Sequence, residues 1–125
     1  MAEKGLAKNR SDLSFVSQAL ADEERIAAAL AEQGDHAAAA AMARRAIDRA
    51  EHLTAPSEKD RVANYISRAY FSLAAVEAKF GNRGEAQAAA ARAVAGWRQS
   101  LESGSKLVNS AELAMAEALL SEPRQ

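Results

Sequence analysis

Two stretches of this chain repeat each other at a distance of 47 residues, and this repeat limits the possible folds more than any other feature. Residues 27–50 read AAALAEQGDHAAAAAMARRAIDRA, and residues 74–97 read AAVEAKFGNRGEAQAAAARAVAGW. The aligned pairs are Gly34 with Gly81, Asp35 with Asn82, Ala39 with Ala86, Ala43 with Ala90, Arg45 with Arg92, Ala46 with Ala93 and Ile47 with Val94. A unit of this size cannot bury its own apolar face, so such copies stack on one another. The sequence therefore predicts two similar units packed side by side.

The alanine content indicates that these units are helical. Alanine fills 33 of the 125 positions, whereas all aromatic residues together fill six. Because alanine has the highest helix propensity and leaves little bulk on a helix surface, it favours long helices whose axes approach closely. A chain of this length forms one domain around one core. The predicted fold class is therefore all-α.

Apolar residues recur at three- and four-residue steps in five segments, as on the buried face of a helix. These segments predict helices at residues 11–33, 36–53, 57–80, 83–102 and 111–120. We expect the first four to form two long antiparallel hairpins, and the fifth to be a short closing helix. Residues 1–10 are polar and lack the apolar period, so we expect a flexible leader there. A single helical-repeat domain at 11–120 and a frayed tail at 121–125 complete the prediction.

Residues typical of helix ends stand between these segments. Gly34 and Gly81 can adopt the positive φ that ends a helix, and Asp35 can accept hydrogen bonds from the first amides of the next helix. Three further pairs have the spacing of a capping box, namely Ser57 with Asp60, Asn82 with Glu85 and Asn109 with Glu112. We expect a helix to begin at each of these sites.

Several functions are excluded by composition and by missing motifs. The net charge is -1, with 16 basic and 17 acidic residues, so the basic surplus of a nucleic-acid-binding domain is missing. Without cysteine there is no disulfide, thiolate metal site or cysteine nucleophile. No GxSxG, GxGxxG, P-loop or HExxH spacing occurs, so we expect neither an enzyme nor a bound cofactor. No signal peptide and no run of about 20 apolar residues is present, so we expect no membrane partner and a cytoplasmic location.

The histidines and the charged patch on the first predicted helix suggest no site of their own. His36 and His52 are 16 positions apart on one predicted helix, about 24 Å at 1.5 Å per residue, so they cannot share a metal ion. We expect both to be polar surface residues. Glu23, Glu24 and Arg25 are expected to form a solvated face.

The repeat resembles a tetratricopeptide repeat at the positions where that family keeps small or defined residues. The second copy matches at Tyr70, Leu73, Ala74, Gly81, Ala86 and Ala93, and the first at Ile26, Ala27, Gly34, Ala39 and Ala46. Glu77 and Ala90 stand where the family prefers aromatic residues, and the period of about 47 exceeds the usual 34, so longer helices are expected. Residues 63–120 also look like the C-terminal repeat region of large bacterial signalling proteins, among them serine/threonine kinases and winged-helix regulators.

The tetratricopeptide resemblance implies a protein-binding groove. In that family the first helix of each pair lines the concave face, which places Glu24, Arg68, Phe71 and Ala75 there. Ala28, Ala31 and Ala78 leave room beside them for a peptide that carries an acidic group, with Arg68 as its charge anchor. Alternatively, Phe71 packs under the leader or against another copy of the chain. We expect Trp97 to fill the gap between the fourth helix and the closing helix.

Two functions remain open. The chain is a binding module for a peptide or partner domain, or it is a self-association module. The second possibility follows because five helices with few large side chains bury little area alone, which favours a homodimer through alanine-rich faces.

Overall fold

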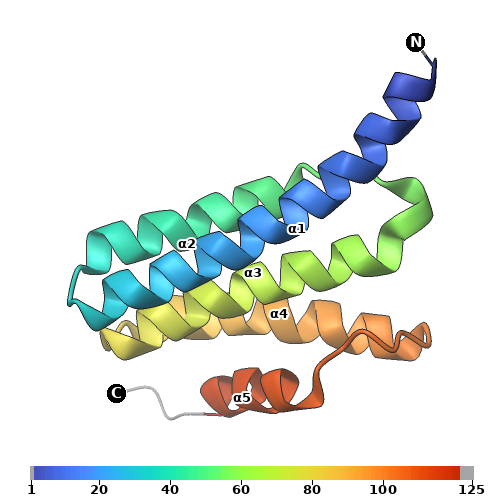
Figure 1. The fold of residues 1–125 in the computed structure, drawn as a ribbon. Coiled ribbons are helices and arrows are strands. Elements are labelled where there is room, and N and C mark those ends of the chain that lie inside the picture. The colour runs from blue at the N-terminus through green and yellow to red at the C-terminus, as the bar shows by residue number, and fades with distance from the viewer. Residues whose placement is uncertain (1, 122–125) are drawn as a thin grey trace.

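The computed structural model describes residues 2–121, with side chains from residue 13 onward, and these residues are all-α (Figure 1). The elements are α1 (Ala2–Glu32), α2 (His36–Glu51), the 3₁₀ turn η1 (Pro56–Glu58), α3 (Lys59–Lys79), α4 (Arg83–Glu102) and α5 (Ser110–Leu120). No strand occurs among the described residues. The predicted fold class is therefore confirmed.

The helices lie alongside one another, and α3 is at their centre. It contacts α1, α2, α4 and α5, while α1 also packs on α2 and α4 on α5. In Figure 1 the chain reverses direction at each connection, and the start of α1 extends beyond the other helices. Among the described helices, α3 is therefore the one that contacts each of the others.

The core is built mainly from alanine. Ala27, Ala43, Ala69, Ala74 and Ala90 are fully buried, with few larger side chains among them. Small side chains let helix axes approach closely, as the composition predicted. The larger members of this cluster are Leu20, Ile47, Leu73 and Val76.

The two aligned glycines end their helices in the same way. Gly34 has a φ of 83° and Gly81 a φ of 77°, in the left-handed region that favours glycine. In each case the glycine amide donates to the carbonyl three residues earlier, and the next amide donates to the carbonyl five residues earlier. This is the Schellman pattern of hydrogen bonds. Both copies of the repeat thus contain the same type of helix ending.

The predicted helix starts are only partly confirmed. Asp35 accepts a hydrogen bond from the amide of Ala38, and Asn109 accepts from the amides at 111 and 112, so both are N-caps as predicted. Ser57 does not cap a helix, because it lies within η1 and α3 begins at Lys59 without a side-chain cap. Asn82 precedes α4, but its side chain makes no capping bond. The Asn82 side chain contacts His36 and Glu77 instead.

The first helix begins earlier than predicted. The structure has α1 starting at Ala2, whereas the sequence predicted a leader at 1–10 and a helix from Ser11. Residues 2–10 contain mostly good helix formers, and the prediction gave too much weight to their missing apolar period. Met1 and the part of the predicted tail at 122–125 lie outside the described residues.

Candidate functional site

A shallow hollow lies between α1 and α3. It encloses about 200 Å³ and is lined by Ala28, Ala31, Glu32, Ser72, Ala75, Val76 and Lys79. Ala28 and Ala75 are exposed, while Ala31 and Val76 are buried beneath them. The floor is therefore apolar and its side chains are small, so an inserted group can come close to both helix backbones.

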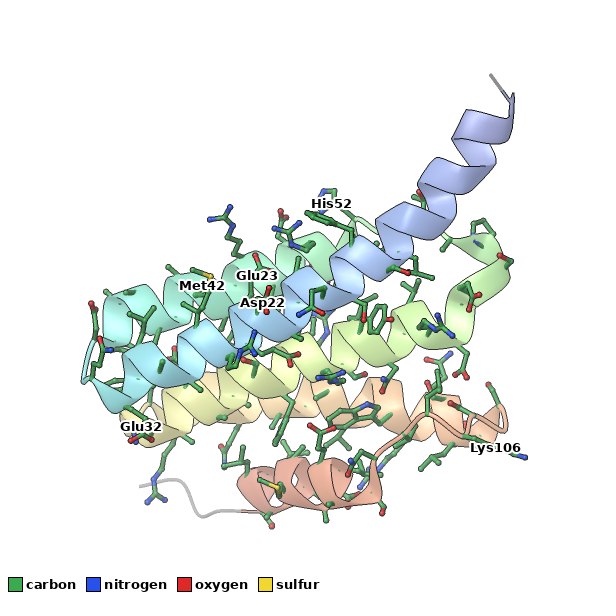
Figure 2. The ribbon with its side chains drawn as sticks, viewed as in Figure 1. Asp22, Glu23, Glu32, Met42, His52 and Lys106 are labelled. Atoms are coloured by element: carbon green, nitrogen blue, oxygen red, sulfur yellow. The ribbon has the colours of Figure 1, made fainter. Side chains whose placement is uncertain are left out.

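The hollow is built by equivalent positions of the two repeats. Ala28 and Ala75 are 47 residues apart, as are Glu32 and Lys79. The Lys79 ammonium group lies 2.9 Å from the Glu32 carboxylate, and this pair stands at one end of the hollow. Figure 2 shows Glu32 at the last turn of α1. Because both partners are well exposed, the pair adds little stability and can exchange with charges from outside.

Glu24 and Arg68 join the same two helices one to two turns further back. The Arg68 guanidinium donates to Glu24 Oε2 at 2.9 Å. Burial raises the pKa of Glu24 above its ordinary range, Arg68 opposes this change, and the nearby Glu112 of α5 adds to it. Arg68 thus already holds a carboxylate of its own chain, whereas the sequence suggested it as an anchor for a partner's carboxylate.

Phe71 lies apart from the lining of the hollow. Its ring centroid is 5.8 Å from that of Trp97, and the two rings are tilted by 57°. Phe71 is half-buried against a second core cluster that contains Trp97, Val94 and Ala116. Of the four predicted contact residues, Ala75 lines the hollow, Glu24 and Arg68 pair near it, and Phe71 packs on Trp97.

Trp97 is the largest fully buried side chain of the described residues. Leu113 and Ala116 of α5 belong to its cluster, so it fills the space between α4 and the closing helix as predicted. Its indole N–H donates to Asn64 Oδ1 at 3.1 Å, which satisfies the one polar atom of the ring. Leu101, one turn later, is 48% exposed and does not continue this buried face.

Two carboxylates are buried, and for one of them, Glu23, the sequence predicted solvent. Glu23 is only 6% exposed and accepts two hydrogen bonds from Arg49, at 3.0 and 3.2 Å, so its assignment to a solvated patch is wrong (Figure 2). Glu77 is 2% exposed and is bonded to His36 and to Asn82. His36 is therefore a half-buried link between the α1–α2 turn and the α3–α4 turn rather than a surface residue. Both carboxylates serve the packing of helices.

Four lining residues were not predicted, namely Glu32, Ser72, Val76 and Lys79. The repeat carries a signal for only two of them, because Glu32 and Lys79 are 47 residues apart and form an ion pair across α1 and α3. Within the described part of the chain, no three His, Asp or Glu residues gather in a way that could hold a metal ion. No helix there is long and apolar enough to cross a membrane.

Comparison with known proteins finds no matching family model, no similar curated protein and no similar solved structure. The resemblance to tetratricopeptide repeats and to bacterial signalling proteins therefore stays a prediction from the sequence. What the molecule can bind has to be argued from its own surface.

Proposed function

We propose that this chain is a protein-interaction module of tetratricopeptide-like architecture, which binds a peptide or a helix of a partner protein over the α1–α3 hollow. The observation that carries the proposal is the apolar hollow itself, with an exposed ion pair at its end. In this interpretation α1–α2 and α3–α4 are two stacked hairpins, and α5 closes the second.

The spacing of the repeat supports this arrangement. In stacked hairpins the first helices lie side by side and run parallel, so equivalent positions face each other. Ala28 and Ala75 meet this expectation in the hollow, and Glu32 and Lys79 meet it as an ion pair. The first helices then form a continuous surface on which an extended or helical segment can lie.

The chemistry of the hollow favours a partner with one apolar side chain flanked by charges. An aliphatic side chain that inserts between Ala28 and Ala75 loses its contact with water, which is worth about 1.5–3 kcal/mol for a fully buried Leu or Val. Charges on either side of it can meet Glu32 and Lys79 at one end. At the other end, Arg68 is hydrogen-bonded to Glu24. It can bind a partner carboxylate only if its guanidinium group contacts both carboxylates or breaks the bond to Glu24.

The experiment fills the hollow without touching the core. Ala75→Leu adds bulk at an exposed position of the lining, and Ala91→Leu adds the same bulk at an exposed position of α4 outside the hollow. Each variant is used as bait in the native host, and the captured proteins are quantified against wild type. We expect Ala75→Leu to lose specific partners that Ala91→Leu retains. Equal recovery by both variants, with unchanged thermal melting, would show that the hollow is not the binding site.

A further inference from the structure

A polar hollow of about 520 Å³ lies where α3 begins and α4 ends, at the same end of the molecule in Figure 1. The first turn of α3, the last two turns of α4 and the connection after α4 form its lining. These residues are Lys59, Asp60, Ala63, Gly96, Gln99, Ser100, Ser103, Gly104 and Ser105. We call this site the polar hollow. It shares no residue with the α1–α3 hollow, so the two sites are separate.

The connection after α4 is fixed in place by hydrogen bonds. Gly104 has a φ of 86°, and its amide donates to the carbonyl three residues earlier at 3.0 Å. The Ser105 amide donates to the carbonyl five residues earlier at 2.9 Å, which completes a Schellman ending for α4. The Ser105 hydroxyl donates to Asp60 Oδ2 at 3.0 Å and so joins the connection to α3. The polar hollow is therefore formed before any ligand enters, as small-molecule sites usually are.

A buried hydroxyl group opens into the polar hollow without a partner. Ser100 is only 8% exposed and belongs to the lining. Its Oγ makes no hydrogen bond within the part of the chain that the structure describes. In the same part, every side-chain nitrogen or oxygen that is sealed from solvent has a partner, so Ser100 Oγ is open on its hollow side. Because a buried hydroxyl normally has a hydrogen-bond partner, this one points to a molecule that occupies the hollow.

Two neighbouring residues supply opposite charges to the polar hollow. Lys59 forms no ion pair with any described residue, and Asp60 uses only Oδ2 to accept from Ser105. The first amides of α3 have no side-chain cap, so a negative group is favoured there beside the Lys59 ammonium. A ligand with a single charge would meet one attractive and one repulsive group. A ligand that carries both a carboxylate and an ammonium group matches Lys59 and Asp60 together.

An apolar hollow of about 410 Å³ adjoins the polar hollow, and Lys59 and Ala63 belong to both linings. The rest of its lining is mostly apolar, namely Leu53, Thr54, Ala55, Pro56, Val62 and Ile66. Because the Ala63 side chain is small, an aliphatic group that starts in the polar hollow can extend over it. Removal of that group from water would favour binding.

From the unpartnered Ser100 hydroxyl, the two opposite charges and the adjoining apolar hollow, we infer that this end of the molecule binds a zwitterionic small molecule with an aliphatic side chain. The ligand carboxylate lies at Lys59 and the first turn of α3, and its ammonium group lies at Asp60. A polar atom of the ligand bonds to Ser100 Oγ, and its side chain lies over Ala63. Free aliphatic amino acids and short peptides of such residues share this chemistry.

Amide NMR spectra of the full chain, titrated with L-leucine and separately with leucyl-leucine, test this inference. We expect saturable shifts at the amides of residues 59–63 and 96–105, with a dissociation constant below about 1 mM. The tighter of the two probes identifies a free amino acid or a peptide as the source of the zwitterion. Isocaproate lacks the ammonium group, isoamylamine lacks the carboxylate and glycine lacks the side chain. Each of these three should bind at least about tenfold more weakly than leucine.

Three variants test the assigned contacts, and their amide spectra show whether each is folded. Asp60→Asn keeps an acceptor for Ser105 but removes the charge, so it should raise the dissociation constant at least about tenfold. Ser100→Ala removes one hydrogen bond and should raise it about three- to tenfold. Lys106→Gln is the control, because it removes a charge from the same connection but lies outside the lining, and it should bind as wild type does.

Several results would overturn the inference. One is the lack of a saturable shift with either probe up to about 10 mM, and another is a set of shifts confined to other residues. Equal binding of isocaproate, isoamylamine or glycine would contradict the assigned ligand chemistry. Wild-type affinity in both Asp60→Asn and Ser100→Ala would place the site elsewhere. Ala75→Leu should bind leucine unchanged, so failure here is distinct from failure of the α1–α3 hollow.

Discussion

The contact between Gly96 on α4 and Ser67 on α3 allows a quantitative test of how closely these helices pack. A Cβ atom added at Gly96 would overlap Ser67 Oγ, while Ser67 Cβ would lie 3.6 Å away, an ordinary contact distance. Ser67 is only 2% exposed. Alanine at position 96 must therefore displace a buried hydroxyl group, and the conflict disappears once that hydroxyl is removed.

Two opposing effects set the magnitude. Gly96→Ala gains up to about 1 kcal/mol of helix propensity. Overpacking a buried contact costs about 1–3 kcal/mol. In the wild-type background we therefore expect Gly96→Ala to lower the free energy of unfolding by about 0–2 kcal/mol. In the Ser67→Ala background the overlap is gone, and the same change should raise it by up to about 1 kcal/mol.

Urea denaturation of wild type, the two single variants and the double variant gives the coupling energy between the positions. We expect about 1–3 kcal/mol, in the range for residues in direct contact. Gly84→Ala is the control, because nothing lies within 4 Å of a Cβ added there, so it should act alike in both backgrounds. A coupling below about 0.5 kcal/mol would mean that α3 and α4 are further apart than the structure has them, and would refute the reasoning.

Three further predictions follow from buried and titrating groups. Trp97→Ala should lower the free energy of unfolding by about 3–5 kcal/mol in urea titrations, since the ring is fully buried, and a loss below about 1 kcal/mol would contradict its burial. Burial raises the pKa of Glu24, so this carboxyl group binds a proton more readily in the folded chain than in the unfolded chain. The contribution of Glu24 to the free energy of unfolding therefore falls as the pH rises from about 4.3 through the pKa of the folded state. The stability difference between wild type and Glu24→Gln should therefore change with pH over that interval, and a difference that is constant there argues against the raised value. A hydrogen bond to the Asp48 carbonyl and the charge of that residue raise the pKa of His52, so the stability it contributes below about pH 6.5 is lost as the pH rises through the folded pKa. Its ring signals in NMR should accordingly titrate above the usual histidine value.

The repeat and the residues typical of helix ends allowed much of the fold to be predicted. Gly34 and Gly81 end their helices with positive φ, and Asp35 and Asn109 cap the following helices. These features depend on residues within a few positions of each other. Local hydrogen bonds decide them, so the sequence pattern is sufficient.

The wrong capping predictions have a different cause, since the polar groups concerned have partners far along the chain. Asp60 accepts a hydrogen bond from Ser105 rather than completing a capping box with Ser57. The Asn82 side-chain amide lies 3.2 Å from His36 Nε2, 46 positions away, rather than capping α4. A capping sequence indicates only which local hydrogen bond a side chain can make. A tertiary hydrogen bond that also gives a buried charge a partner stabilises the fold more than a local cap does.

In the candidate site, too, some features could be predicted from the sequence and others depend on distant partners. The small residues Ala28 and Ala75, which the resemblance placed on one groove, line the same hollow between α1 and α3. The state of Arg68 was not predicted, because its bond to Glu24 joins residues 44 positions apart. Helical periodicity predicts the face of the helix on which a residue lies. It does not predict the distance or the direction of an oppositely charged side chain on another helix.

The polar groups between α2 and α3 explain how an alanine-rich core still specifies one arrangement. Alanine side chains bury little area and interlock weakly, so many relative positions of two such helices cost similar free energies. Pairs that need defined geometry remove this freedom at both ends of the interface. At the turn end Glu77 is bonded to His36, and at the other end the Tyr70 hydroxyl donates to Glu51 at 2.9 Å. Sliding α2 along α3 by a helical turn would take His36 and Arg44 away from the buried Glu77 carboxylate and leave only Asn82 beside it, which is costly for a buried charge.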